Sequence, residues 1–349
     1  MSPVSGGSVQ GPPLLVLVGA TAAGKSTVAE QLAESLAGEL VSADALQVYR
    51  GLDIGTAKPT ASTRARYAYH CIDYLEPAQR CSAGAYAATA WRAISDVRAR
   101  GRQPILVGGS GFYVQAVVEG LDEAPASDPT WRAALRRISE RSGIESLHAA
   151  LHRLDPDWAA KLGSRDAQRI LRALEVILRT GRRMSELTES DASAPPGARG
   201  AAWLGVSWPR ALLYERIERR VDEMLASGWV DEVEGLLGAG VPTDAHALQA
   251  IGYRQLARVC RGEIDLGAAR DEIVRATRRY AKRQLAWYRR WPQIQWLDYQ
   301  AGEDPRGEAE RARATRLARQ LLTDAAWAAG ESDVAARQPE SHNGCDERT

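Results

Sequence analysis

The chain has 349 residues, of which 45% are hydrophobic, and a formal net charge of +1. This length and apolar content allow one large domain, or a main domain with a smaller insertion. The near-zero charge excludes a strongly basic overall surface, so any binding of nucleic acid has to depend on local clusters of basic residues.

The cysteines and the N-terminal residues favour a reducing compartment. None of the four cysteines has the C-x-x-C spacing of a zinc site, and neither a zinc site nor a disulfide framework is favoured. Residues 1–13 carry no basic segment of a signal peptide, and no apolar run reaches the roughly 18 residues of a membrane span. We therefore expect a cytoplasmic protein with no membrane partner, and a monomer, because no apolar helical stripe is left without a role.

The first predicted elements are a strand, a loop and a helix. Residues 14–18 are a short apolar run of the buried parallel-strand kind, and the periodic stretch 26–37 predicts a helix. This alternation continues and predicts a doubly wound α/β sheet. Further strands are predicted at residues 39–43, 70–74, 104–107, 202–207 and 294–297, within a core that spans residues 12–120 and 201–328.

A helical insertion domain is predicted over residues 121–200, where strand signals disappear and helical ones continue up to a turn-rich segment with Pro195, Pro196 and Gly197. The polar residues 329–349 are predicted to be a disordered tail. Between these two regions, helices are predicted at about residues 210–227, 245–261 and 268–290.

The loop after the first strand matches G-x-x-x-x-G-K-[ST] at every fixed position. In such a loop the backbone N–H groups converge on phosphate oxygens, Lys25 adds a point charge, and Ser26 can ligate Mg²⁺. The motif therefore predicts a polyphosphate site in a P-loop NTPase-like parallel sheet core. Its residues are Gly19, Ala20, Thr21, Ala22, Ala23, Gly24, Lys25 and Ser26.

Asp44 is the candidate acid nearest to this loop. A kinase or NTPase would usually carry a carboxylate at the end of a neighbouring core strand, but residues 104–107 lead into Gly108, Gly109 and Ser110 without one. Because ligands bind at the carboxyl ends of parallel strands, we expect Asp44 to lie close to the phosphate loop. The alternative is an aspartate that caps a helix or a turn.

Two segments concentrate basic residues. Residues 275–291 contain seven basic residues and no acidic one, interleaved with Tyr280, Trp287, Tyr288 and Trp291. Such a helix suits contact with a phosphate backbone and stacking on the bases of single-stranded RNA. The alternative is a solvated face whose aromatic side chains pack on the core.

The second basic segment is a predicted helix with one face of arginines. Its spacing puts apolar residues on the opposite face, and we expect the arginines to have no matched acids. This arrangement predicts an anionic partner larger than a nucleotide. The arginines are Arg165, Arg169, Arg172, Arg179 and Arg183, and the apolar residues are Ile170, Leu174, Ile177 and Leu178.

Taken together, these motifs resemble the tRNA dimethylallyltransferases, also called tRNA isopentenyltransferases. The resemblance spans about residues 14–298 and departs from the family at Ala20, where proline is usual, and at Ser110 and Ala286, where threonine is usual. Ser110 keeps a hydroxyl, so we expect its contact to survive. Besides the phosphate loop, the most specific segments are residues 41–44, 49–59, 106–113, 166–176, 251–254 and 281–287.

The resemblance implies transfer of the dimethylallyl group of dimethylallyl diphosphate to N6 of the adenosine 3′ to the anticodon in tRNA, with release of diphosphate. Asp44 matches the family's general base, Thr21 a loop threonine near the reacting centre, and Arg220 an arginine that contacts the diphosphate. Lys25 and Mg²⁺ on Ser26 would neutralise the leaving group. For Arg220 and for Arg216, one turn earlier, the alternative is a surface helix with Glu215 and Glu218 as partners.

The resemblance also implies contacts with the anticodon stem-loop of tRNA. A base in a loop must be extruded and held for the reaction, which accounts for arginines and aromatic residues together. The positions that match are Asp44, Ala45, Leu46, Gln47, Ser110, Arg132, Gln168, Arg169, Ile170, Leu171, Arg172, Gln249, Gly252, Tyr253, Arg254, Lys282, Arg283, Gln284, Trp287 and Arg289.

Three other functions fit the sequence less well. A small-molecule kinase explains the phosphate loop but leaves both basic segments without a purpose. An isopentenyltransferase for free adenine nucleotides would not need an insertion with an arginine face. An RNA-binding module with a vestigial phosphate loop is disfavoured by the intact Lys25, Ser26 and Asp44.

Overall fold

A computed structural model describes residues 11–121, 124–125, 127–189 and 200–335. The chain forms two compact units: the first comprises Met1–Val118 and Pro195–Thr349, and the second comprises Glu119–Ala194. The second unit overlaps the stretch 121–200 that the sequence predicts to be a helical insertion.

The first unit contains a sheet of six parallel strands in the order β3-β2-β4-β1-β5-β6. β1 lies between β4 and β5, so its carboxyl end, where the phosphate loop begins, is at the centre of the sheet. The α/β prediction with a parallel sheet is confirmed. The strands are β1 (Leu15–Gly19), β2 (Gly38–Ser42), β3 (Tyr69–His70), β4 (Gln103–Gly108), β5 (Ala202–Ser207) and β6 (Gln295–Asp298).

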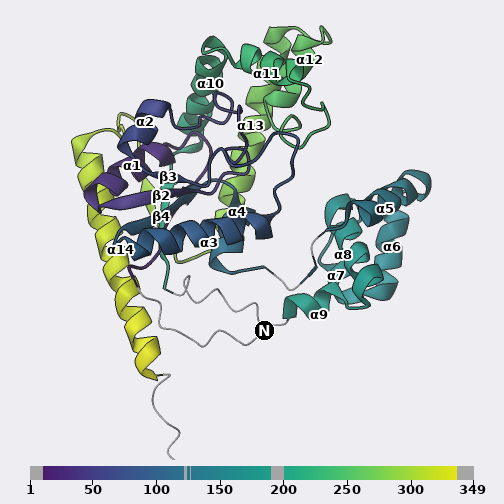
Figure 1. Cartoon of the computed structure of the whole chain (residues 1–349), viewed down its shortest axis with the longest axis horizontal. Helices are drawn as coiled ribbons and strands as arrows, with labels where there is room; N and C mark the ends of the chain where they lie inside the picture. Colours follow the sequence, from purple (N-terminus) through teal and green to yellow (C-terminus); the bar gives the residue numbers. More distant parts are fainter. Residues whose placement is uncertain (1–10, 122–123, 126, 190–199, 336–349) are drawn as a thin grey trace, which may run out of the picture. The chain divides into compact units, whose positions relative to one another are not determined.

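Helices cover both faces of this sheet, as Figure 1 shows. Successive residues of β1 point to opposite faces, and each set is fully buried in a separate apolar cluster: Val16 and Val18 in one, Leu15 and Leu17 in the other. The first cluster contains side chains of α3 (Ala83–Ala99), α4 (Gly111–Val118), α11 (Trp229–Gly238), α12 (Tyr253–Cys260) and α13 (Leu266–Tyr288). The second contains side chains of α1 (Lys25–Ser35), α10 (Arg210–Ala226), α13 and α14 (Glu308–Ala335).

Two predicted elements are shorter than expected. The strand predicted at residues 70–74 is the two-residue β3, because Cys71 and Asp73 adopt positive φ angles of 63° and 54°, which a strand cannot contain. The helix predicted at residues 245–261 begins only at Tyr253, after a series of turns.

The stretch predicted to be a disordered tail begins within a helix, which includes residues 329–335. These residues form the end of α14, which continues to Ala335. Residues 336–349 lie outside the described residues. Within the described ranges, no helix is both long and apolar enough to cross a membrane.

The second unit consists of helices around a small apolar core of its own. Leu135, Leu147, Leu151, Ile170 and Leu174 are buried in this core. Asp128 caps the first helix by accepting the N–H groups of its first turn. The helices are α5 (Pro129–Ser142), α6 (Ile144–Leu154), α7 (Pro156–Ala160), α8 (Ala167–Thr180) and α9 (Met184–Glu189).

Candidate active site

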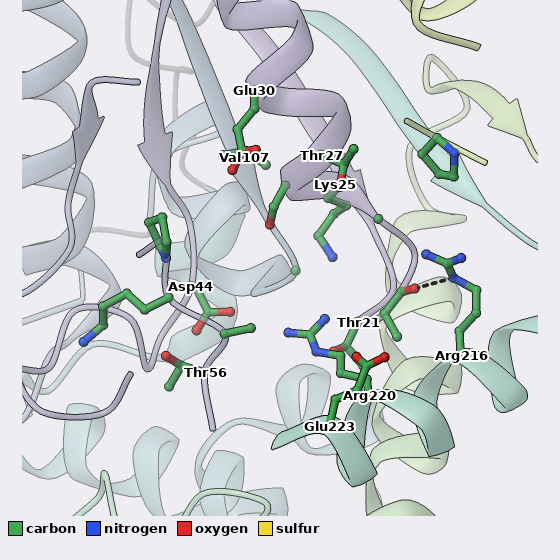
Figure 2. A pocket seen from close by; sticks show the side chains of 18 of the residues that line it. Thr21, Lys25, Thr27, Glu30, Asp44, Thr56, Val107, Arg216, Arg220 and Glu223 are labelled. Atoms are coloured by element: carbon green, nitrogen blue, oxygen red, sulfur yellow. Dashed lines mark hydrogen bonds between the residues drawn. The ribbon is translucent and has the colours of Figure 1, made fainter. Parts of the chain in front are cut away.

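The carboxyl ends of three strands open into a pocket of about 1670 Å³ in the first unit. Thr21 follows β1, Asp44 follows β2 and Gly109 follows β4, and all three line this pocket. α10 supplies Arg216 and Arg220 from the facing wall. Figure 2 shows Lys25, Asp44 and Arg220 converging on the same space. The expected proximity of Asp44 to the phosphate loop is therefore observed.

The phosphate loop turns into α1 through Gly24, whose φ of 92° lies in the left-handed region. Lys25 follows directly, and its Nζ donates a hydrogen bond to the carbonyl oxygen of Ala20 at 2.7 Å. Burial, and to a smaller extent the charge of Arg220, lower the pKa of Lys25 to about 7, against the opposing effect of Asp44. The ammonium is thus held by the protein in a position where an anionic ligand would favour its charged form.

Asp44 caps a turn and also lines the pocket. Its Oδ1 accepts the N–H groups of Leu46 at 2.9 Å and Gln47 at 3.4 Å, which is the turn-capping role. Its carboxylate also lines the pocket and lies on the side facing Arg220 (Figure 2). The turn fixes the carboxylate through one oxygen and leaves it oriented toward the pocket.

The two α10 arginines have backbone and aromatic partners. Arg216 Nε donates to the carbonyl oxygen of Ala22 at 2.9 Å, and its guanidinium lies 4.4 Å from the centre of the Trp208 ring. Burial lowers the pKa of Arg220, and the charge of Asp44 opposes this shift. Neither arginine forms an ion pair within 4.0 Å with a carboxylate of the described residues.

Of the two alternative partners proposed from the sequence, Glu218 is paired elsewhere, and Glu215 forms no ion pair with either arginine among the described residues. Glu218 pairs with Arg270 at 3.3 Å and with Arg278 at 2.9 Å, both on α13. Glu218 therefore pairs with arginines of α13. Arg216 contacts the phosphate loop, and Arg216 and Arg220 both line the pocket.

One wall of the pocket is the loop of residues 53–58, which is anchored by charges that the sequence did not single out. Lys58 is fully buried, and its Nζ contacts Asp53 Oδ1 and Asp73 Oδ1, each at 2.6 Å. Glu232 of α11 accepts the N–H groups of Asp53 at 2.8 Å and Ile54 at 2.6 Å. No local pattern could have indicated Glu232, because it is 179 residues away from Asp53.

The hydroxyl of Ser110 bonds within the protein, where its Oγ accepts the N–H of Ala45 at 2.9 Å. Its contact with tRNA stays a prediction. Gln47 also bonds within the protein: its Oε1 accepts from Ser42 Oγ at 2.8 Å, and its Nε2 donates to the carbonyl oxygen of Thr56 at 3.2 Å. Both residues stand beside the pocket and organise its loops.

Most of the remaining predicted tRNA contacts of the first unit fall into a buried and an exposed group. Tyr253 is fully buried and donates to Glu232 at 2.6 Å, and a side chain at Gly252 would clash with Trp229. These two positions therefore support the loop of residues 53–58 from inside the protein. The exposed group consists of Gln249, Arg254, Lys282, Arg283 and Arg289, while Trp287 is half-buried beneath the Arg290 guanidinium.

In the second unit, the expectation of arginines without matched acids is wrong. Glu175 is fully buried on α8 and forms ion pairs with Arg172 at 3.1 Å, with Arg179 at 3.6 Å and with Arg132 of α5 at 3.8 Å. This acid lies on the arginine face itself. Of the other paired acids, Asp166 and Glu186 lie three residues from their arginines, and Glu145 lies on α6. The other pairs are Arg165–Glu145, Arg169–Asp166 and Arg183–Glu186.

The apolar face of α8 is buried only in part. Ile170 and Leu171 lie in the core of the unit, so their side chains face away from any ligand, whereas Leu178 is 51% exposed. Gln168 and Arg169 are exposed at the start of the helix. Of the predicted contacts on α8, these two present their side chains to solvent.

Comparisons with known proteins give a consistent result. A profile described as IPP transferase matches residues 47–291. The chain is 44% identical over 291 residues to a tRNA dimethylallyltransferase of Geobacter sulfurreducens, covering 83% of this chain and 93% of the relative. It is also 44% identical over 287 residues to one of Thermomicrobium roseum, covering 82% and 86% of the two chains. The solved structure of a tRNA isopentenylpyrophosphate transferase from Bacillus halodurans is similar with a TM-score of 0.67 and 34% identity, over 90% of this chain and 98% of that one.

Proposed function

The chain belongs to the IPP transferase family, and we propose that it transfers the dimethylallyl group of dimethylallyl diphosphate to N6 of the adenosine 3′ to the anticodon in tRNA, releasing diphosphate. The observation that carries this proposal is the convergence of Lys25, Asp44 and Arg220 on one pocket at the carboxyl ends of the strands. A phosphate-binding loop facing a carboxylate suits a reaction that releases diphosphate and transfers a proton from the attacking amine to the carboxylate.

The leaving group would be stabilised by positive charge already in place. As the bond from the allylic carbon to the diphosphate oxygen breaks, negative charge accumulates on the diphosphate, and fixed cations and N–H donors lower the barrier. Lys25 and Arg220 face the pocket directly, and Arg216 holds the outer side of the phosphate loop through Ala22. Thr21 lies on the same loop, on the side toward the pocket (Figure 2).

Asp44 would accept the proton of the adenine amine. This amine is a poor nucleophile because its lone pair is delocalised into the ring, so removing its proton as the new N–C bond forms assists the attack. Oδ1 of Asp44 is engaged by the N–H groups of Leu46 and Gln47. We assign the proton to Oδ2, which the turn leaves available.

The donor set near the phosphate loop fits Mg²⁺. Ser26 is exposed at the first turn of α1 and lines the pocket, and no three His, Cys, Asp or Glu side chains form a metal site among the residues described. Mg²⁺ typically takes one or two protein oxygens and completes its shell with phosphate oxygens and water. Ser26 would hold the ion, which would supply charge neutralisation to the diphosphate.

The tRNA would be held mainly through its phosphates. Lys282, Arg283 and Arg289 extend from the exposed side of α13, while Tyr280 and Gln284 of the same helix line the pocket. A helix that is basic outside and contributes to the pocket inside suits a substrate whose backbone is bound at the surface while one base enters the site.

The decisive experiment supplies radiolabelled dimethylallyl diphosphate and Mg²⁺ together with either an unmodified anticodon stem-loop with adenosine 3′ to the anticodon or free AMP. We expect label in the stem-loop and none in AMP. Asp44→Ala should abolish transfer. Asp265→Ala is the matched control, because Asp265 caps α13 through the N–H of Ala268 at 2.8 Å without lining the pocket, and it should retain transfer.

Three other outcomes of this experiment would contradict the proposal. Label in AMP would place it among enzymes that act on free adenine nucleotides. Absence of transfer to either acceptor would refute prenyl transfer and favour a phosphoryl-transfer reaction at the phosphate loop. Equal loss in Asp44→Ala and Asp265→Ala would show that Asp44 acts only through folding.

A further inference from the structure

Gln284 of α13 joins two loops of the pocket through its side-chain amide. Its Oε1 accepts the N–H of Thr21 at 2.8 Å, and its Nε2 donates to the carbonyl oxygen of Gly109 at 2.8 Å. The side chain is buried, with 5% of its surface exposed. Both ends of the amide are thus bonded within the protein, although the family resemblance places Gln284 among the tRNA contacts.

The Gly109 bond extends to Asp44 through one further residue. Ser110 accepts the N–H of Ala45 at 2.9 Å and donates its own N–H to the carbonyl oxygen of Ala43 at 3.2 Å. The turn after β4 therefore holds the backbone on both sides of Asp44. Gln284 connects this turn to the phosphate loop, so one amide links the loop of Thr21 with the loop of Asp44.

The packing around the amide leaves it little freedom. A side chain at Gly109 would clash with Gln284 Nε2, so the close approach requires glycine at this position. One turn along α13, the Tyr288 hydroxyl donates to the carbonyl oxygen of Gly108 at 3.4 Å. One turn earlier, Tyr280 lines the pocket. The face of α13 that carries these residues at intervals of four is therefore fitted against the β4 turn and the pocket.

We propose that Gln284 is a positioning residue that fixes Thr21 of the phosphate loop relative to Asp44. The inference rests on the proposed function, in which these two loops hold the diphosphate and the attacking amine. Loss of the amide would leave a buried N–H and a buried carbonyl without partners. It would also allow the loops to shift, and a displacement of about 1 Å at a reacting centre reduces the rate by up to roughly 100-fold.

The test compares Gln284→Met with Gln103→Met. Methionine keeps the approximate length of glutamine and removes both hydrogen bonds. Gln103 is the matched control, because it is also buried and donates through Nε2 to the carbonyl oxygens of Pro13 at 2.6 Å and Pro104 at 3.0 Å, at the opposite end of β4. We expect Gln284→Met to lower kcat for stem-loop prenylation by roughly 10- to 100-fold with KM for the stem-loop changed by less than about twofold, and Gln103→Met to leave kcat unchanged.

Gln284→Glu separates the two bonds. It retains an acceptor for the Thr21 N–H and replaces the donor to Gly109 with a second acceptor, so we expect a fall in kcat as well. If Gln284→Met does not fold, this variant carries the same comparison. A rise in KM for the stem-loop with unchanged kcat would overturn the proposal and assign Gln284 to tRNA binding.

Hydrogen exchange at the Thr21 amide tests the link without any activity. In the wild-type chain this N–H is bonded to a buried acceptor and should exchange slowly, and in Gln284→Met it should exchange faster while Gln103→Met leaves it unchanged. Unchanged protection in Gln284→Met would overturn the proposal. If the wild-type chain shows no prenyl transfer, the proposed function fails, and this measurement alone decides whether Gln284 holds the phosphate loop.

Discussion

The basic residues of α8 and those of the pocket look alike in sequence but have different partners. On α8 and beside it, Arg172, Arg179 and Arg132 surround the buried carboxylate of Glu175. In the pocket, Lys25 contacts a carbonyl oxygen, and Arg216 contacts a carbonyl oxygen and an aromatic ring. Helical spacing identifies which face carries the arginines, but only the fold shows whether their charge is already neutralised.

This difference separates structural cations from ligand-binding ones. An arginine paired with a buried carboxylate contributes little net field to its surroundings and stabilises the local fold. Cations without a carboxylate partner keep a positive potential, which attracts an anionic ligand. We therefore expect loss of a pocket cation to reduce activity, and loss of the Glu175 pairing to reduce the stability of the second unit.

The largest effect should come from Arg220→Ala. Removing a fixed positive charge from the leaving-group side of the pocket should lower kcat by roughly 100- to 1,000-fold, with the thermal unfolding midpoint nearly unchanged. Single-turnover transfer to the stem-loop measures the effect. Arg210→Ala is the control, since Arg210 is exposed at the start of the same helix and does not line the pocket. Equal rates for the two variants would remove Arg220 from the proposed mechanism.

Glu175→Gln should act on stability instead. The substitution leaves the arginines around a neutral amide and weakens the acceptor for the N–H of Asp128, which Glu175 Oε1 holds at 2.5 Å. Loss of one partner of a buried ion pair costs about 3–5 kcal/mol. Hydrogen exchange of peptides from residues 127–189 reports this unit separately from the sheet.

The control for Glu175 is Glu145→Gln. Glu145 pairs with Arg165 at 3.2 Å, but both side chains are largely exposed, so its loss should cost less than about 1 kcal/mol. Equal exchange rates in the two variants would mean that the Glu175 cluster contributes no more than a surface pair.

The pocket cation Lys25 should make diphosphate binding depend on pH. Its pKa in the free protein is about 7, and a bound anion raises it. Below pH 7 the amine is protonated before and after binding, so Lys25 adds no pH dependence to the affinity. Above pH 7 binding takes up a proton at Lys25, which should raise Kd by up to about tenfold per pH unit. Calorimetry with diphosphate in metal-free buffers from about pH 6 to 9 measures this dependence.

Lys25→Arg removes this titration, because guanidinium stays charged over the same range. The ionisation of diphosphate itself is common to both proteins, so the difference between their pH profiles isolates Lys25. Identical profiles would show that the Lys25 amine remains charged without ligand.

Local signals predicted the sheet and the phosphate loop, whereas the partners of the site residues were not predictable. The loop from Gly19 to Ser26 is contiguous, and β1 and β4 each contain a short continuous apolar run, so sequence alone located them. The hydrogen bond from Thr21 to Gln284 spans 263 residues, and that from Asp53 to Glu232 spans 179. Such pairs depend on how helices pack on the sheet, which no pattern within one segment encodes.

The same limit explains the error on α8. The spacing predicted that Ile170 lies opposite the arginine face, but it did not identify Glu175 as a partner of those arginines. It did not show that Glu175 would be buried, because burial of that face depends on Arg132 of α5 and on the segment before it. A charged residue within a helix face has to be assigned by its tertiary neighbours.

The smallest effect should come from Arg169→Ala. Arg169 has a carboxylate partner, as the arginines around Glu175 do, but its pair is exposed to solvent. Arg169 is exposed and pairs with Asp166 three residues earlier at 2.5 Å. A solvent-exposed pair of this kind is worth less than about 1 kcal/mol, so a tRNA phosphate can replace the carboxylate at little cost. Arg169→Ala should weaken stem-loop binding only a few-fold, leave stability unchanged and reduce the slope of log Kd against log salt by about one.

Binding titrations at several KCl concentrations measure the slope, with Arg165→Ala as the matched loss of an exposed pair. An unchanged slope in both variants would mean that the α8 arginines only stabilise the second unit, and the pocket and α13 would then have to supply the basic contacts to tRNA.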